Sequence, residues 1–169
     1  MAVSQITLLL FVSDLNSALN EAVLRSRNIK LIVNASNIQG VTYPQIPGLE
    51  VVHVPVQDVP HAPLDQYFAL VSERIHHSIT QGQACLLHCV SGRSRSPALV
   101  IAYVMRFLSL SLVQAHVLVQ ERRPFIHINA GFWRQLLNYE LLLRTAGSDE
   151  DRPGLEQDLK EAEPQTSCV

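Results

Sequence analysis

Short apolar runs alternate with amphipathic stretches along this chain of 169 residues, and no other feature limits its possible folds as strongly. The runs "QITLLLFV", "IKLIVNAS", "LEVVHVPV" and "ACLL" have the length of strands, and most are rich in β-branched residues. Apolar residues at helical spacing, or helix-capping residues, predict helices over residues 13–28, 64–80, 97–108, 111–123 and 131–145. Strands that alternate with helices form largely parallel sheets. The sequence therefore predicts an α/β fold, with a central, mostly parallel, twisted sheet flanked by helices on both faces.

Some element boundaries are predicted from single residues. The first apolar run, residues 5–12, is expected to form one strand. Pro97 suits the first position of its helix, with Ser96 directly before it as the N-cap. Ser111 and Gln114 have the spacing of a capping box, which predicts the start of the next helix.

Composition and charge separate a folded part from a tail. Residues 1–147 contain 11 Lys and Arg against 8 Asp and Glu, whereas residues 148–169 contain 2 against 7 and few large apolar groups. We therefore predict one folded domain over residues 1–147 and an acidic, disordered tail over residues 148–169. With a net charge of −2, nucleic acid is not an expected partner. The sequence leaves the oligomeric state open.

The cysteines and the apolar runs indicate the compartment. Cys85, Cys89 and Cys168 are too few and too widely spaced for a disulfide framework. This pattern is typical of a reducing environment, so we predict a cytoplasmic chain, with the nucleus as a second location. The run "ITLLLFV" is too short to span a membrane and no basic region precedes it, so no membrane partner is expected.

The stretch "HCVSGRSRS", residues 88–96, places a thiol and two cations among small residues, between an apolar strand and an apolar helix. Ligands bind at the carboxyl ends of such strands, where the following helix exposes N–H groups and a partial positive charge. Gly92 permits a backbone conformation that other residues avoid, and Arg95 offers a planar fork for phosphate oxygens. The same positive field favours the thiolate of Cys89, which is the nucleophilic form. The stretch therefore predicts a site in which a thiolate attacks a bound phosphate group.

These residues resemble a known family. The stretch matches the His-Cys-x5-Arg-Ser signature of the cysteine-dependent protein tyrosine phosphatases, and "GRSRS" resembles the dual-specificity branch. Further segments resemble that branch in the same order, among them "LIVNAS", "VPVQD", "AYVMRFLSLSLVQA" and "NAGFWRQLLNYE". The resemblance covers about residues 4–145 and implies a protein tyrosine phosphatase-like fold. The chain is similar to the small, stand-alone, "atypical" dual-specificity phosphatases.

The resemblance implies a role for each site residue. Cys89 is the nucleophile, Arg95 holds the phosphate, and Ser96 stabilises the cysteine sulfur as it leaves. Asp58, in "VPVQD", is the general acid and then the general base. The backbone of the loop binds the phosphate through Val90, Ser91, Gly92, Arg93 and Ser94, and supporting roles fall to His88, Asn34 and Asn129. No metal or other cofactor is implied, because the thiolate and the arginine carry the chemistry.

Plainer interpretations stand beside several of these roles. A free cysteine is usually a small buried hydrophobe, and Asp58 before Pro60 also suits a turn. Arg122 and Arg123 are interpreted as a solvated helix end, with attraction of anionic substrates as the alternative. Three differences from the family pattern stand out: Arg93 in place of a small or apolar residue, Val59 and His61 after Asp58, and Ile128 before Asn129.

Three functions remain open at this level. The first is a phosphatase that hydrolyses phosphotyrosine, and phosphoserine or phosphothreonine, in protein substrates through a phosphocysteine intermediate. The second is a phosphoprotein-binding module with little turnover, which Arg93 and the altered segment after Asp58 keep open. The third is a phosphatase for a non-protein phosphate, either a phosphoinositide or an RNA 5′ end. Only one extra cation in the loop, Arg93, favours this function.

Overall fold

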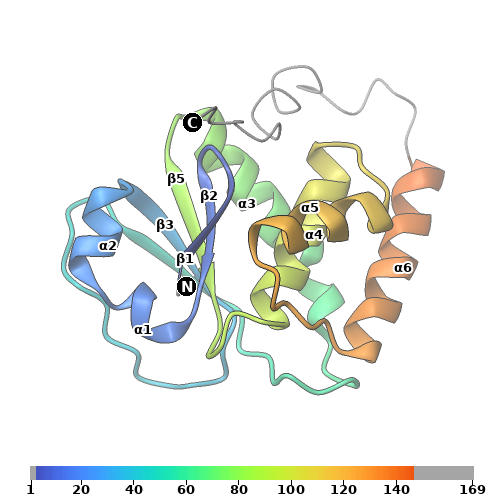
Figure 1. The fold of residues 1–169 in the computed structure, drawn as a ribbon, viewed down its shortest axis with the longest axis horizontal. Helices are drawn as coiled ribbons and strands as arrows, with labels where there is room; N and C mark the ends of the chain where they lie inside the picture. The colour runs from blue at the N-terminus through green and yellow to red at the C-terminus, as the bar shows by residue number, and fades with distance from the viewer. Residues whose placement is uncertain (1–2, 147–169) are drawn as a thin grey trace.

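The computed structural model describes residues 3–146, and its centre is a mixed five-stranded sheet (Figure 1). Its strands are β1 (Val3–Thr7), β2 (Leu10–Ser13), β3 (Ile29–Asn34), β4 (Glu50–His53) and β5 (Ala84–His88), in the spatial order β1-β2-β5-β3-β4. Only the β1–β2 pair is antiparallel, so the prediction of a mostly parallel sheet is confirmed. The predicted tail, residues 148–169, lies outside the described residues.

Helices cover both faces of the sheet, as predicted (Figure 1). Two short helices, α1 (Leu15–Ala18) and α2 (Glu21–Ser26), pack on one face. The other face carries a 3₁₀ turn, η1, and four longer helices: η1 (Leu64–Tyr67), α3 (Phe68–Thr80), α4 (Arg95–Phe107), α5 (Leu112–Arg122) and α6 (Ala130–Ala146). This larger layer is built around α4, whose residues 95–105 are all buried.

Strand β5 is apolar along most of its length, with no alternation of apolar and polar residues, because both of its faces are buried. Cys85 and Leu87 point into the large core beneath α3 and α4, whereas Ala84 and Leu86 point into the small core beneath α1 and α2. A strand buried on both faces reads as a continuous apolar run. Every residue of β5 is buried, so the loop that follows it starts from a fixed point.

Three predicted boundaries were wrong. Residues 5–12 are not one strand, because the chain turns at Leu8 and returns as β2, antiparallel to β1. The helix predicted over residues 13–28 is two helices, capped separately by the side chains of Asp14 and Asn20. Helix α4 begins at Arg95, with Ser94 at its N-cap, so Pro97 lies inside the first turn, where a missing N–H costs little. The capping box of Ser111 and Gln114 is confirmed.

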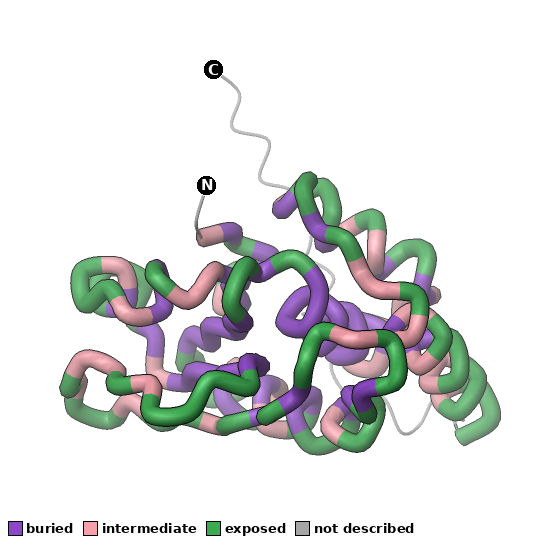
Figure 2. The backbone as a smooth tube through the Cα atoms, turned by 90° about the horizontal axis from the view of Figure 1, so that it is seen from below, coloured by how far each residue is buried: buried purple, intermediate pink, exposed green. Residues whose placement is uncertain are grey.

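The parallel strands end together at the lower edge of the sheet in Figure 1. The loop from β5 to α4, the loop after β4 and the start of α6 all lie at this edge (Figure 1). Seen from below, buried backbone occupies the middle of the molecule and exposed loops surround it (Figure 2). No helix within residues 3–146 is long and apolar enough to cross a membrane.

Candidate active site

The cysteine loop, residues 88–96, wraps its backbone around the sulfur of Cys89. The N–H of Gly92 donates to Cys89 Sγ at 3.2 Å, and Ser96 Oγ lies 3.2 Å from the same sulfur. Cys89 is buried, as are Gly92, Ser94 and Ser96, whereas Val90, Ser91 and Arg93 are exposed. A backbone N–H and a hydroxyl that face one sulfur stabilise negative charge there. The structure thus brings together the cysteine and the serine that the sequence pairs.

Gly92 has the left-handed backbone conformation that its sequence position predicts, with φ of +69°. There is also no space for a side chain, because a Cβ at Gly92 would lie 2.5 Å from Arg123 Nη2 and 2.6 Å from Ser13 O. Both the conformation and the close approach therefore require glycine. This turn is what aims the N–H of Gly92 at the sulfur.

Arg95 enters the site from the first turn of α4 and is almost fully buried. Its Nη1 donates to Val56 O at 2.9 Å and to Asn37 Oδ1 at 3.2 Å. Its Nε is buried and has no hydrogen-bond partner among the described residues. One edge of the guanidinium is therefore fixed by the protein, and Nε remains as a donor for an oxyanion.

Arg123 is the main residue whose position was predicted wrongly from the sequence. It was interpreted as part of a solvated helix end, but only 1% of it is exposed. Its Nε donates to Gly92 O at 2.7 Å, and its Nη1 donates to Ser4 Oγ at 3.0 Å. Burial lowers the pKa of this guanidinium, an effect that nearby Asp14 and Cys89 oppose. Arg123 ties the cysteine loop to strand β1; its neighbour Arg122 is half-buried.

His88 lies at the base of the loop, completely buried, as its supporting role predicts. Its Nδ1 lies 2.9 Å from Cys89 O, and its Nε2 lies 2.6 Å from the hydroxyl of Tyr43. Because Cys89 O is an acceptor, Nδ1 carries the proton in the neutral ring, and the Tyr43 hydroxyl donates to Nε2. Burial lowers the pKa of His88 and raises that of Tyr43 to about 12, so both groups are neutral at pH 7.

The Asp58 loop, residues 54–63, meets the cysteine loop through Asn129. The backbone N–H of Asn129 donates to Ser94 Oγ at 3.2 Å, and its Nδ2 donates to Asp58 Oδ1 at 2.9 Å. Asn129 Oδ1 also accepts from the N–H of Phe132 at 2.8 Å, which caps the first turn of α6. A single residue thus joins the exposed carboxylate of Asp58 to the loop that holds Cys89.

The start of α6 supports the rest of the Asp58 loop, which the sequence did not reveal. Gly131 packs so closely against the carbonyl of Pro60 that a Cβ there would overlap it. Gln135 Nε2 donates to Ala62 O at 2.8 Å, and Gln135 Oε1 accepts from Asp65 N at 2.8 Å. The signal was present in "NAGFWRQ", but only the fold shows which loop this segment touches.

Asn34 supports the site less directly than expected. Its Oδ1 accepts from the N–H of Ser36 at 3.0 Å and from the Ser36 hydroxyl at 2.7 Å. These bonds shape the turn after β3, and Asn37, just beyond that turn, is the residue that contacts Arg95. Ile128 and Val59, two departures from the family pattern, are half-buried and pack against the large core.

Within residues 3–146 there is no group of three His, Cys, Asp or Glu side chains placed to hold a metal ion. Cys85 faces the core, and burial raises the pKa of its thiol to about 12. A thiol of that kind is inert at neutral pH, in contrast to one placed at the start of a helix.

Comparisons with known proteins agree with this geometry. The model of the family described as "Dual specificity phosphatase, catalytic domain" matches residues 10–141. Dual specificity protein phosphatase 14 of Homo sapiens is 44% identical over 139 residues, which are 82% of this chain and 69% of that protein. Dual specificity protein phosphatase 18 of Mus musculus is 43% identical over 140 residues, 83% of this chain and 73% of that protein.

Solved structures lead to the same family. The crystal structure of human DUSP28 superimposes with a TM-score of 0.80 at 35% identity, and covers 85% of this chain and 96% of that one. A family match over most of the folded chain, together with relatives above 30% identity, confirms the resemblance that the cysteine loop suggests. This chain belongs to the dual-specificity phosphatase family, as a small atypical member of the cysteine-dependent protein tyrosine phosphatase superfamily.

Proposed function

We propose that this chain hydrolyses phosphotyrosine, and also phosphoserine or phosphothreonine, in proteins through a phosphocysteine intermediate. The observation that carries the proposal is the pairing of two features at one loop. Cys89 Sγ receives the Gly92 N–H and faces the Ser96 hydroxyl, and the buried Nε of Arg95 has no hydrogen-bond partner within residues 3–146. A nucleophile and a phosphate-binding fork thus lie at the start of one helix.

In the first step, the thiolate of Cys89 attacks phosphorus and the bond from phosphorus to the substrate oxygen breaks. Arg95 and the loop N–H groups bind the remaining phosphate oxygens, which carry the charge of the transition state. The leaving oxygen needs a proton, and Asp58 supplies it. The link through Asn129 supports this role, because it joins Asp58 to Ser94 of the cysteine loop.

In the second step, a water molecule attacks phosphorus and gives its proton to Asp58. The bond from sulfur to phosphorus breaks, inorganic phosphate leaves, and Cys89 returns as a thiolate. The Ser96 hydroxyl, 3.2 Å from the sulfur, donates to that thiolate and makes it a better leaving group. His88 does not contact the substrate; through Cys89 O it fixes the carbonyl at the start of the loop.

The test is hydrolysis of an aryl phosphate as a function of pH by wild type, Cys89→Ser and Asp58→Asn. We expect no turnover by Cys89→Ser. General acid catalysis contributes roughly 10²–10⁴-fold, so Asp58→Asn is expected to lose about that factor on an aryl phosphate whose leaving oxygen needs a proton, such as phenyl phosphate, and much less on p-nitrophenyl phosphate. Trapping of ³²P-phosphate on wild type at acid pH, and not on Cys89→Ser, would identify the intermediate. Turnover by Cys89→Ser equal to wild type would overturn the mechanism.

Binding without turnover is the alternative to exclude. Cys89, Arg95 and Asp58 are all present and joined through the contacts above, which favours catalysis. A wild-type protein that binds phosphopeptides but releases no phosphate would support the binding module. Hydrolysis of phosphoinositides or RNA 5′ phosphates, with phosphopeptides left intact, would support the non-protein substrates.

Phosphorylated proteins in the cytoplasm, and also in the nucleus, are the proposed substrates. A catalytic thiolate needs a reducing compartment, since oxidation of Cys89 would stop the reaction. Neither nucleic acid nor a membrane is proposed as a partner. Fractionation of cells that express the full chain with a small tag would test the location, and recovery mainly with membranes would contradict it.

A further inference from the structure

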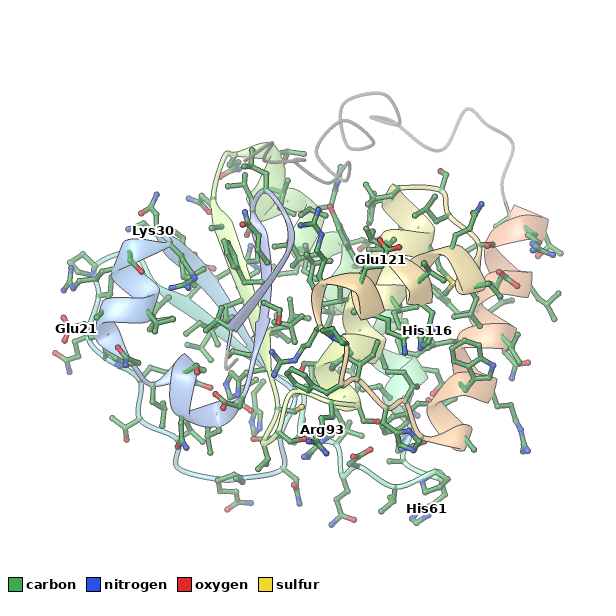
Figure 3. All side chains as sticks on the ribbon, viewed as in Figure 1. Glu21, Lys30, His61, Arg93, His116 and Glu121 are labelled. Carbon is green, nitrogen blue, oxygen red and sulfur yellow. The ribbon has the colours of Figure 1, made fainter. Side chains whose placement is uncertain are left out.

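The side chain of Arg93, the exposed arginine of the cysteine loop, has no role in the chemistry proposed above. Arg93 and Arg95 are two residues apart, but Arg95 is buried and points into the site, whereas Arg93 is exposed at its rim. In Figure 3, Arg93 lies at the lower end of the molecule, the end that also carries His61 of the Asp58 loop. The cation of Arg93 thus belongs to the loop that holds Cys89 and lies at the same end of the molecule (Figure 3).

The backbone of Arg93 is fixed. Its carbonyl accepts from the N–H of His127 at 2.8 Å, and the next residue, Ser94, accepts from Asn129. The position of its Cα relative to Cys89 is therefore set by the same bonds that shape the site. Only the side chain retains freedom.

Phe125 restricts that freedom. The Arg93 guanidinium lies 5.9 Å from the centroid of the Phe125 ring, and the Arg123 guanidinium lies 4.4 Å from the same centroid. Arg123 in turn is bound to the carbonyls of Ser91 and Gly92. Contact of a guanidinium with an aromatic face holds the charge in place without neutralising it.

The charge of Arg93 is not compensated by the protein. Among residues 3–146, no carboxylate lies within ion-pair distance of it. Asp14, the acidic group that acts on Arg123, already caps α1 through the Ser17 N–H at 2.9 Å. His127, beside Arg93, adds no negative charge.

From this placement we propose that Arg93 is a specificity residue, which selects phosphopeptides that carry a second anionic group next to the phosphorylated residue. The inference rests on the proposed function and names the substrate class of the same site. The Cα atoms of Arg93 and Arg95 are at most roughly 7 Å apart, so a peptide whose phosphate is held by Arg95 passes close to the residue that carries the exposed cation. A carboxylate or a second phosphate supplies this chemistry.

The test compares phosphotyrosine peptides that differ only in the flanking residues. One peptide has Gln on both sides, one has Glu, one has Lys, and one has phosphothreonine. For wild type we expect kcat/KM to be about threefold to fivefold higher with Glu than with Gln, the range for an exposed charge pair. Phosphothreonine is expected to exceed Glu, because it carries about −1.5 to −2 charges. The Glu/Gln ratio should approach one at high ionic strength.

Variants assign the preference to one side chain. Arg93→Ala should bring the Glu/Gln ratio close to one, Arg93→Lys should keep most of it, and Arg93→Glu should favour the Lys peptide. Each variant is judged on its ratio, so a general change in activity cancels. Arg27→Ala is the matched control, because Arg27 is also exposed, lies 6.0 Å from the Phe11 ring, and precedes β3 at the opposite edge of the sheet.

The outcomes separate this inference from the proposed function. A wild type that hydrolyses all peptides with equal kcat/KM, or an Arg93→Ala variant that keeps the Glu/Gln ratio, overturns the role of Arg93 and leaves the phosphatase intact. A wild type that hydrolyses none of them contradicts the proposed function. The same ratios are then measured as Kd values on Cys89→Ser, alone and combined with Arg93→Ala, and equal ratios in the two proteins overturn the inference.

Discussion

The cysteine loop and the Asp58 loop meet at one site, but the protein holds them by different means. The cysteine loop leaves a fully buried strand and receives bonds from several separate parts of the chain, among them Arg123, Leu15 at Val90, Tyr43 behind His88, and Asn129 at Ser94. The Asp58 loop has buried residues at both ends, but Asp58 itself is exposed, and among residues 3–146 its carboxylate is bound by the side chain of Asn129.

This difference matches the two roles proposed for the loops. An oxyanion site works best when its donors are fixed before the substrate arrives, because no reorganisation is then needed in the transition state. A general acid must instead reach leaving groups of different shape, from a tyrosine ring to a serine side chain. The comparison therefore predicts that a substitution that displaces the cysteine loop lowers kcat/KM equally for every substrate. For a substitution that displaces the Asp58 loop, the loss of kcat/KM should depend on the leaving group.

Gly92→Ala should have the largest effect. The new Cβ would lie 2.5 Å from Arg123 Nη2 and 2.6 Å from Ser13 O, in a left-handed conformation that itself costs roughly 1–3 kcal/mol. A displacement of about 1 Å in such a site lowers rates by roughly 10²-fold. We expect a loss of at least about that size in kcat/KM, equal for aryl and alkyl phosphates, together with a lower Tm.

The measurement is steady-state hydrolysis of both kinds of phosphate, with thermal unfolding alongside. Gly82→Ala is the control, because Gly82 also has a positive φ, of +72°, but its Cβ would have nothing within 4 Å. It carries the backbone strain without the clash. Equal losses of activity in the two variants would mean that the close packing of Gly92 against Arg123 is not what matters.

Gly131→Ala should displace the Asp58 loop and have the second-largest effect on activity. The added methyl would overlap the carbonyl of Pro60, so the Asp58 loop must move away from α6. We expect a loss of roughly tenfold or more for alkyl phosphates, which need a proton on the leaving oxygen, and a much smaller loss for p-nitrophenyl phosphate, which does not. A loss that is the same for both substrates would show that the movement reaches the cysteine loop, and would contradict the distinction drawn between the two loops.

Asn129→Ser tests the residue that joins the two loops. Serine keeps a hydroxyl to cap α6, and its backbone N–H can still donate to Ser94, but the donor to Asp58 is lost. We expect a threefold to tenfold loss, on the order of one net hydrogen bond, confined to alkyl phosphates. Stability should change by less than about 0.5 kcal/mol; a larger drop in urea unfolding would mean that the cap was lost as well.

The two loops also differ in how far the sequence predicted them. The shape of the cysteine loop could be predicted because the strand, the glycine and the arginine are consecutive, although its helix begins at Arg95 and not at Pro97. The support of both loops was predicted only in part, because it comes from residues distant in the chain. The resemblance implies supporting roles for His88, Asn34 and Asn129, whereas the contacts of Arg123, Gly131 and Gln135 were missed. Arg123 lies 31 residues from the Gly92 carbonyl that it binds, and Asn129 lies 71 residues from Asp58.

Arg123 shows why such contacts cannot be predicted from the sequence alone. An arginine after a helix is usually solvated, and nothing in "ERRPF" tells Arg122 from Arg123. Only the packing of α5 beneath the cysteine loop turns one of the two inward. The wrong boundary at residues 5–12 has the same origin, since the turn at Leu8 is fixed by pairing of β1 with β2 and not by a turn residue.

The smallest predicted effect is on stability, and it comes from His88 at the base of the cysteine loop. Burial lowers its pKa below 6.5, the value expected in the unfolded chain. Between the folded and the unfolded pKa, the unfolded chain binds a proton that the folded protein excludes, so the free energy of unfolding rises with pH through this window and levels off above it. Each unit of lowering contributes roughly 1.4 kcal/mol.

Urea unfolding at a series of pH values, for wild type and His88→Asn, measures this contribution, because the other histidines are common to both proteins and cancel in the difference. We expect the difference in stability between the two proteins to shrink as the pH falls below 6.5, since wild type loses stability there that the variant does not. If His88→Asn and wild type instead run parallel down to acid pH, then His88 takes up its proton inside the fold. The base of the cysteine loop would then be open enough to solvate a charge, and no more rigidly held than the loop that carries Asp58.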